Sequence, residues 1–146
     1  LVYTWAPVQH ELEMAGPVRA ILHVASSAPD TDFTAKLVDV DAGGAARILC
    51  DGIVRLRYRQ GVERVVGYRP GQVERIEIEL GSIADALPPG HRVRLEVTSS
   101  NFPKYDRNLN TGRAQAYEKE LRTARQQVRH GAGTLSQLIL PIVKTQ

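Results

Sequence analysis

A chain of 146 residues, 42% of them hydrophobic, has the length and apolar content of one folded domain, which argues against wholesale disorder. Its net charge of +3 comes from interleaved acids and bases, which is too small and too mixed a charge to indicate a nucleic-acid partner. The single cysteine, Cys50, cannot close an intrachain disulfide, and its strand-like surroundings favour a small buried residue over a reactive thiol.

No targeting or membrane segment is recognisable in the sequence. There is no run of roughly 18 apolar residues and no signal-peptide pattern at the amino end, so we expect no membrane contact and a cytoplasmic location. The chain opens in strand-like sequence without an initiator Met, which indicates a fragment of a longer protein.

Hydrophobic alternation predicts a series of strands. Residues 18–25 are almost continuously apolar and predict a central strand, and residues 33–40 and 45–50 predict the next two. In residues 53–59 we expect Val54, Leu56 and Tyr58 to point inward and three arginines to face water. Residues 72–80 and 92–97 alternate in the same way. Residues 122–130 favour a strand by alternation, although residues 114–127 have a helix-like composition, and residues 138–143 predict a closing strand.

Turn residues separate these runs. Turns are expected at Gly16-Pro17, at Asp51-Gly52 and at residues 88–90, and a short helical turn at residues 81–87. Strands that recur roughly every ten residues predict an all-β sandwich or barrel.

Acidic and histidine side chains are the residues of this chain that could bind a metal ion or take part in catalysis. Asp30 and Asp32 could supply oxygen ligands to a calcium ion, but carboxylates in such a turn more often bond nearby backbone. His91 follows residues 88–90 and is expected to bond a turn. We therefore treat Asp30, Asp32, Phe33 and His91 as structural candidates and expect no metal and no cofactor.

Arginines on the strand faces could mark an anionic partner. The favoured alternative is cross-strand pairing with Glu77, Glu79 and Glu96. The arginines concerned are Arg55, Arg57, Arg59, Arg92 and Arg94.

Residues 98–112 form a long loop after a strand, and loops of this length are usually functional or docked. Its aromatic side chains would be costly to leave in water, so they either dock on a partner or fold back onto the core. The candidate interface residues are Phe102, Tyr105, Asp106, Asn108 and Asn110.

Four segments of the sequence, residues 1–4, 25–40, 50–59 and 90–112, resemble the C-terminal domain of the X-Pro dipeptidyl-peptidase / cocaine esterase (CocE/NonD) family of serine hydrolases. The resemblance implies a jelly-roll β-sandwich of the galactose-binding type, over residues 1–146, that braces an α/β-hydrolase domain and a helical cap of the same chain. It also implies that the catalytic Ser, Asp and His lie in the hydrolase domain, so no residue of this chain is assigned a catalytic role.

Two other functions compete with this non-catalytic scaffold. A carbohydrate- or ligand-binding module would need an aromatic platform, and no aromatic cluster is visible in the sequence. An independent hydrolase is disfavoured because no Gly-x-Ser-x-Gly motif is present. An isolated fragment could also pair as a homodimer through an exposed patch.

Overall fold

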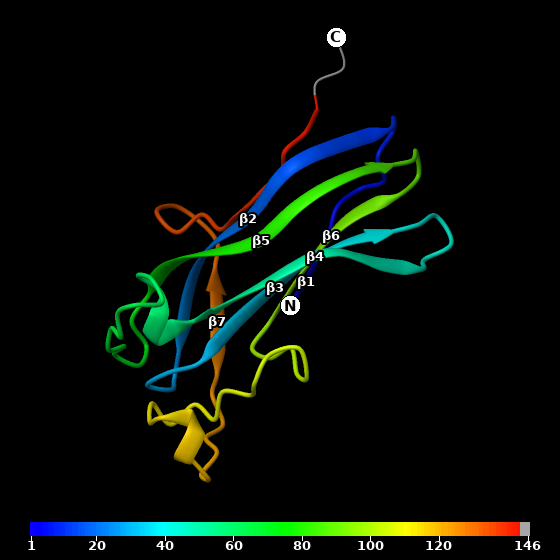
Figure 1. The fold of residues 1–146 in the computed structure, drawn as a ribbon. Helices are drawn as coiled ribbons and strands as arrows, with labels where there is room; N and C mark the ends of the chain where they lie inside the picture. The colour runs from blue at the N-terminus through cyan, green and yellow to red at the C-terminus, as the bar shows by residue number, and fades with distance from the viewer. Residues whose placement is uncertain (144–146) are drawn as a thin grey trace.

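The computed structural model describes residues 1–143 and contains two antiparallel sheets packed face to face (Figure 1). One sheet has the strand order β1-β6-β3-β4, and the other has β5-β2-β7, with β8 also paired to β2. The strands are β1 (Val2–Thr4), β2 (Leu12–Ser26), β3 (Asp32–Val40), β4 (Ala46–Arg55), β5 (Glu74–Leu87), β6 (Arg92–Thr98), β7 (Gln126–Arg129) and β8 (Gln137–Ile139). Two short 3-10 helices, η1 (Leu56–Tyr58) and η2 (Gln115–Tyr117), complete the elements.

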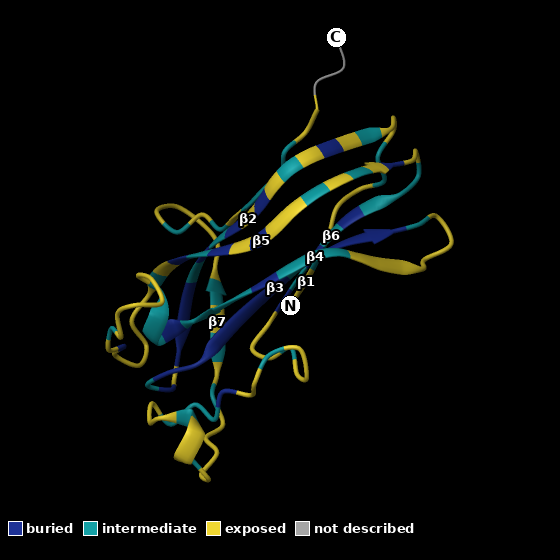
Figure 2. Ribbon diagram, viewed as in Figure 1, coloured by how far each residue is buried: buried dark blue, intermediate teal, exposed yellow. Residues whose placement is uncertain are grey.

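The all-β class expected from the sequence is confirmed. Over residues 1–143 there is no α-helix, and thus none with the length and apolar character needed to cross a membrane. The inward positions of the two most regular strands are buried as expected, with Ile76 and Ile78 on β5 and Leu95 on β6 in the core. Burial follows the sandwich interior, and β3 is buried along almost its whole length (Figure 2).

Three expected chain breaks are wrong because strands run through them. Gly16 and Pro17 lie within β2, Gly52 lies within β4, and residues 81–87 continue β5 instead of forming a helical turn. At Gly81, with φ of +99°, the chain makes a β-bulge in which Leu80 is the extra residue. A β-bulge accommodates the positive φ of a glycine without ending the strand.

Three other strands are shorter than expected. The predicted strand 53–59 ends at Arg55 and passes into η1, although Leu56 is fully buried as expected. Of the predicted strand 122–130, only residues Gln126–Arg129 form a strand, which is β7. The predicted strand 138–143 is represented by β8 and by an isolated bridge between Met14 and Ile142.

One edge of the sandwich is closed where β4 approaches β5. A Cβ atom on Gly52 would lie 2.0 Å from the carbonyl oxygen of Glu79, so only glycine allows the two backbones to come this close. Gly52 therefore serves the contact between the sheets and does not form the hairpin turn that the Asp51-Gly52 pair suggested.

The opposite edge, between β1 and the β7 and β8 strands, is less closed. The main polar link across it joins the Tyr3 hydroxyl to His130 Nε2 at 2.9 Å, with the two rings edge to face. Two cavities described below lie along this edge.

We predict that Gly52→Ala destabilises the chain by about 2 kcal/mol, because the added methyl group overlaps a backbone carbonyl and must push β5 away. Gly67→Ala is the matched control, since a methyl group there meets no atom within 4 Å and neither glycine has a positive φ. Urea denaturation of both variants measures the effect. Equal midpoints for the two variants would show that the β4–β5 approach is not tight.

Candidate functional site

Two aspartates at the β2–β3 connection are buried and paired with arginines. Asp30 is completely buried and accepts hydrogen bonds from the backbone N–H of Arg57 at 3.0 Å and from its Nε at 2.6 Å. Asp32, at the first position of β3, faces Arg55 at the last position of β4. Two bonds of 2.8 and 3.0 Å join the Arg55 guanidinium to both oxygens of that carboxylate. This geometry is the bidentate arrangement that Arg and carboxylate groups favour.

The positive charge of Arg55 is favoured by its contacts. The hydrogen bonds that Arg55 donates to Asp32 raise the pKa of Arg55, and its bond to Asp106 adds to that effect. Buried charges are tolerated when they are paired and hydrogen-bonded, and both carboxylates here meet that condition.

Asn108 connects the two ion pairs. Its side-chain Nδ2 donates to Asp32 at 2.7 Å and to Asp30 at 3.1 Å, and the residue is only 6% exposed. Arg55 also reaches Asp106 at 3.1 Å. We call Asp30, Asp32, Arg55, Arg57 and Asn108 the polar cluster; it fixes the loop 98–112 to the end of the sandwich, where Figure 1 draws the loop below β3.

The far part of the loop is held by further amide contacts. The side-chain oxygen of Asn108 accepts bonds from the Asn110 backbone N–H at 2.9 Å and from Gln115 Nε2 at 3.1 Å. Asn110 has a φ of 62°, a conformation that asparagine tolerates better than most residues, and its side chain donates to the Arg122 carbonyl. The sequence had marked both asparagines without indicating what they bind.

The two aromatic side chains of the loop differ in their surroundings. Phe102 is 62% exposed, so it does not fold back onto the core of this chain. Tyr105 is partly buried, and the Lys104 ammonium lies 5.5 Å from its ring centroid. Lys104 in turn pairs with Asp51, which also accepts a 2.7 Å bond from Asn101.

The expectation that Asp30 and Asp32 bond nearby turn backbone is wrong. Their oxygens are occupied by arginine side chains, by Asn108 and by the Arg57 backbone, which all come from distant parts of the sequence. In the described residues, no group of three or more His, Cys, Asp or Glu side chains is arranged to hold a metal ion.

His91 makes both a turn contact and a carboxylate contact. Its backbone N–H bonds the Pro88 carbonyl at 3.1 Å, as expected, while its Nδ1 lies 2.8 Å from Asp39. Asp39 also pairs with Arg47, which reaches Asp85 on β5 at 2.9 Å. The hydrogen bond from Arg47 lowers the pKa of Asp85. His91 therefore belongs to a polar link between the two sheets.

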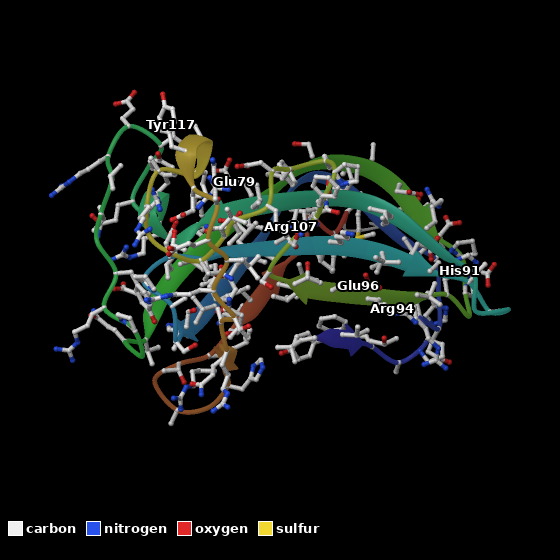
Figure 3. The ribbon with its side chains drawn as sticks, turned by 90° about the horizontal axis from the view of Figure 1, so that it is seen from below. Glu79, His91, Arg94, Glu96, Arg107 and Tyr117 are labelled. Atoms are coloured by element: carbon white, nitrogen blue, oxygen red, sulfur yellow. The ribbon has the colours of Figure 1, made fainter. Side chains whose placement is uncertain are left out.

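The expected cross-strand pairing of the arginines with Glu77, Glu79 and Glu96 is wrong. Of those arginines, only Arg94 pairs with one of these glutamates, Glu96, at 3.8 Å, and both residues lie on β6, so the contact is within one strand (Figure 3). Arg59 pairs with Glu74, and its side chain is 6% exposed instead of facing water. Arg92 donates to the Trp5 carbonyl, while Arg55 and Arg57 enter the polar cluster.

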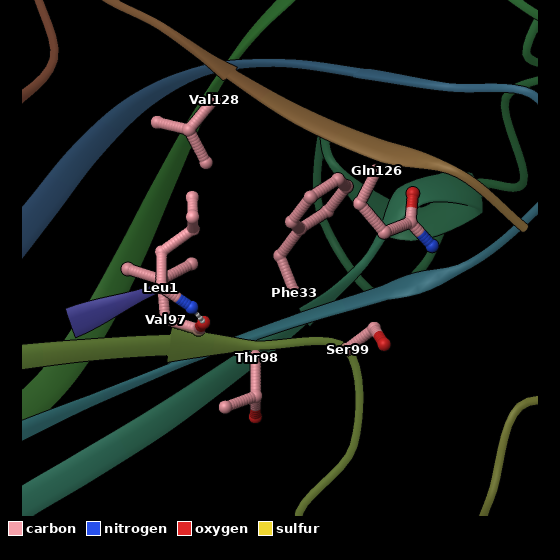
Figure 4. Close-up of a pocket in the computed structure, with 7 residues that line it drawn as sticks. All are labelled: Leu1, Phe33, Val97, Thr98, Ser99, Gln126 and Val128. Atoms are coloured by element: carbon pink, nitrogen blue, oxygen red, sulfur yellow. Dashed lines mark hydrogen bonds between the residues drawn. The ribbon is translucent and has the colours of Figure 1, made fainter.

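A cavity of about 260 Å³ lies next to the start of the loop (Figure 4). Phe33, which is buried in the core, forms one side of this cavity, and Gln126 on β7 forms another. Gln126 Nε2 donates to Thr31 Oγ1 at 2.6 Å, and its Oε1 is buried without a partner in the described structure. The remaining lining residues are Leu1, Val97, Thr98, Ser99 and Val128.

A second cavity, of about 270 Å³, brings together aromatic residues that are far apart in the sequence. Trp5, the single tryptophan, lines it together with Tyr3 and His130. The sequence gave no sign of this grouping, because β1 and β7 belong to different sheets and no local pattern relates them.

The chain is similar to known proteins along almost its whole length. The family described as X-Pro dipeptidyl-peptidase C-terminal non-catalytic domain matches residues 1–139. The chain is 44% identical to the cocaine esterase of Rhodococcus sp. (strain MB1 Bresler), over 99% of this chain and 25% of that protein.

Among solved structures, an α-amino acid ester hydrolase labelled with selenomethionine superposes with a TM-score of 0.91 at 28% identity, over 98% of this chain and 25% of its own. An aminopeptidase from a marine sediment archaeon, Thaumarchaeota archaeon, gives 0.89 at 30% identity, over 99% and 26%. The chain thus spans about a quarter of the length of these relatives, and the superpositions agree with the expected jelly-roll sandwich.

We predict that Arg57→Leu destabilises the chain by about 3 kcal/mol, because it leaves the Asp30 carboxylate buried without its cation. Arg69→Leu, on an exposed arginine of the 59–73 loop, is the matched control and should change stability by less than about 0.5 kcal/mol. Chemical denaturation measures both changes.

The double variant Asp30→Leu/Arg57→Leu should cost less than the sum of the two single variants, with a coupling of about 1–3 kcal/mol. Additive single effects would contradict a direct buried ion pair between the two residues.

We predict that Cys50 reacts slowly with Ellman's reagent, because burial and the adjacent Asp51 carboxylate raise the pKa of its thiol to about 11. At pH 8 about one thiol in a thousand is ionised, and the rate should rise about tenfold per pH unit up to pH 10. The urea-unfolded chain should react at the rate of an ordinary thiol. A fast, pH-independent reaction of the folded chain would indicate an activated cysteine instead.

Proposed function

The chain belongs to the X-Pro dipeptidyl-peptidase C-terminal non-catalytic domain family, and we propose from this membership that it braces the catalytic and cap domains of a larger serine hydrolase. Membership confirms the resemblance drawn from the sequence. The proposal extends it to this chain's role, with residues 1–146 as a single C-terminal domain of that larger protein. The fact that the chain spans about a quarter of its relatives' length supports this assignment.

The names of the relatives support a proposal for the activity of the larger protein. These relatives are called an esterase, an ester hydrolase and an aminopeptidase. We infer a hydrolase that cleaves an ester or an X-Pro peptide through a serine nucleophile located in its α/β-hydrolase domain. Because the matched family is non-catalytic, this chain contributes rigidity and surface to the enzyme instead of reacting groups.

The observation that carries the bracing proposal is that hydrogen bonds anchor the loop 98–112 to the sandwich. Asn108 is buried against the polar cluster, while Phe102, six residues earlier, remains 62% exposed. An exposed aromatic ring on a well-anchored loop loses little conformational entropy on binding, which favours docking. We therefore propose that Phe102, Tyr105, Asp106, Asn108 and Asn110 form or support the contact with the hydrolase and cap domains.

We predict that Phe102→Ala weakens this contact. In the full polypeptide it should lower the melting temperature of the hydrolase domain or split one calorimetric transition into two, because an interface loses about 2 kcal/mol of apolar burial. Tyr117→Ala is the control, since Tyr117 is 88% exposed on η2, outside the loop.

The isolated 146-residue chain provides the second arm of this experiment. There Phe102→Ala should change the free energy of unfolding by less than about 1 kcal/mol, because the ring lies outside the core. Unfolding of the isolated variant would contradict the interface assignment. Loss of a homodimer in sedimentation experiments on the isolated variant would show that the same ring also mediates self-association.

A further inference from the structure

Arg107 is stacked on the exposed ring of the loop. Its guanidinium carbon lies 5.4 Å from the centroid of Phe102, and both residues are exposed. We call these two residues the Phe102–Arg107 pair. Figure 3, seen from below, labels Arg107 among the side chains of this end of the molecule. A guanidinium that stacks on an aromatic face keeps the N–H groups at its edge free for other partners.

Arg107 differs from three other cations near the loop. Lys104 pairs with Asp51, Arg55 with Asp32 and Asp106, and Arg57 with Asp30. For Arg107, by contrast, no residue in the range 1–143 supplies a carboxylate within ion-pair distance. The loop thus presents one unpaired positive charge beside one exposed apolar ring.

The backbone on both sides of Arg107 is held in place. Asp106 bonds Arg55 at 3.1 Å, and Asn108 donates to both carboxylates of the polar cluster. Most of the conformational entropy that an interface loop would lose on binding has therefore been lost already on folding. Such preorganisation increases affinity without adding contacts.

We propose that the Phe102–Arg107 pair recognises a carboxylate beside an apolar recess on the hydrolase portion of the same polypeptide. This inference rests on the proposed bracing function and adds the chemistry of the partner surface. The free edge of the Arg107 guanidinium takes the carboxylate through two parallel hydrogen bonds, while the Phe102 ring fills the recess.

The charge distribution favours a protein surface over a membrane or a nucleic acid. Membrane and nucleic-acid binding sites collect several unpaired Lys or Arg side chains in one patch. Of the two cations within the loop 98–112, Lys104 is paired with Asp51 and only Arg107 has no carboxylate partner among the described residues, while Arg55 and Arg57 at the base of the loop are paired with aspartates. A guanidinium next to an aromatic ring matches the enrichment of Arg and aromatic residues at interfaces between proteins.

The test uses the full polypeptide and compares Arg107→Glu, Arg107→Lys and Arg64→Glu by differential scanning calorimetry. Arg64 is an exposed arginine on a different loop, residues 59–73, so Arg64→Glu applies the same charge reversal outside the loop that carries the pair. We expect Arg107→Glu to lower the melting temperature of the hydrolase transition by about 5 °C, and Arg64→Glu to leave it within about 1 °C. Arg107→Lys should have an intermediate effect, because lysine keeps the charge but loses the two parallel bonds.

Salt dependence gives a second readout that a purely structural role would not change. The difference between wild type and Arg107→Glu should be largest at low ionic strength and shrink at 0.5 M NaCl, as expected for a charge contact at an interface. A difference that does not change with salt would overturn carboxylate recognition.

The outcomes separate this inference from the bracing function. If Arg107→Glu behaves like Arg64→Glu while Phe102→Ala still uncouples the transitions, carboxylate recognition is overturned and bracing stands. If Phe102→Ala and deletion of residues 1–146 from the full polypeptide also leave the hydrolase transition unchanged, the bracing function itself is overturned.

Discussion

The arrangement of the loop 98–112 depends on one side-chain amide. Asn108 donates to Asp30 and Asp32, and each of these carboxylates already holds an arginine. The amide thus joins a segment of more than a dozen residues to two ion pairs that belong to the strands. Buried ion pairs contribute little net stability but strongly penalise any rearrangement that leaves a charge unpaired. A rearrangement of the loop that removed Asn108 would therefore leave both buried carboxylates with one hydrogen bond fewer.

The two edges and one end of the sandwich are held together by different kinds of contact. The β4–β5 edge is closed by a backbone contact that Gly52 permits, and the core lies directly behind it. The opposite edge is joined by Tyr3 and His130, which line one of the two cavities that lie along it. The polar cluster occupies one end. Apolar packing therefore determines the fold, while the cluster determines how the fold presents its longest loop.

Local patterns in the sequence predict the strands well and the site only in part. Alternation identifies β5 and β6 because the period of two is a property of neighbouring residues. Gly52 and Gly81 were misread as turn residues, since a glycine signals a missing side chain or an unusual φ without saying which. Asp30, Asp32 and Asn108 were each singled out, yet their mutual contact spans more than 70 positions. Only strand register and loop placement bring them together, and no local pattern encodes either.

Stability alone does not explain why the residues of the polar cluster are charged. An apolar cluster of similar volume would hold the end of the sandwich at least as well, since desolvation of the two aspartates and two arginines offsets much of their attraction. What the charged arrangement adds is orientation. Asp106 and Asn108 form hydrogen bonds with residues of the cluster. Phe102 and Arg107, which precede and follow Asp106 in the sequence, remain exposed. Under the proposed bracing role, the desolvation cost inside this chain is what keeps its contact surface in a single conformation.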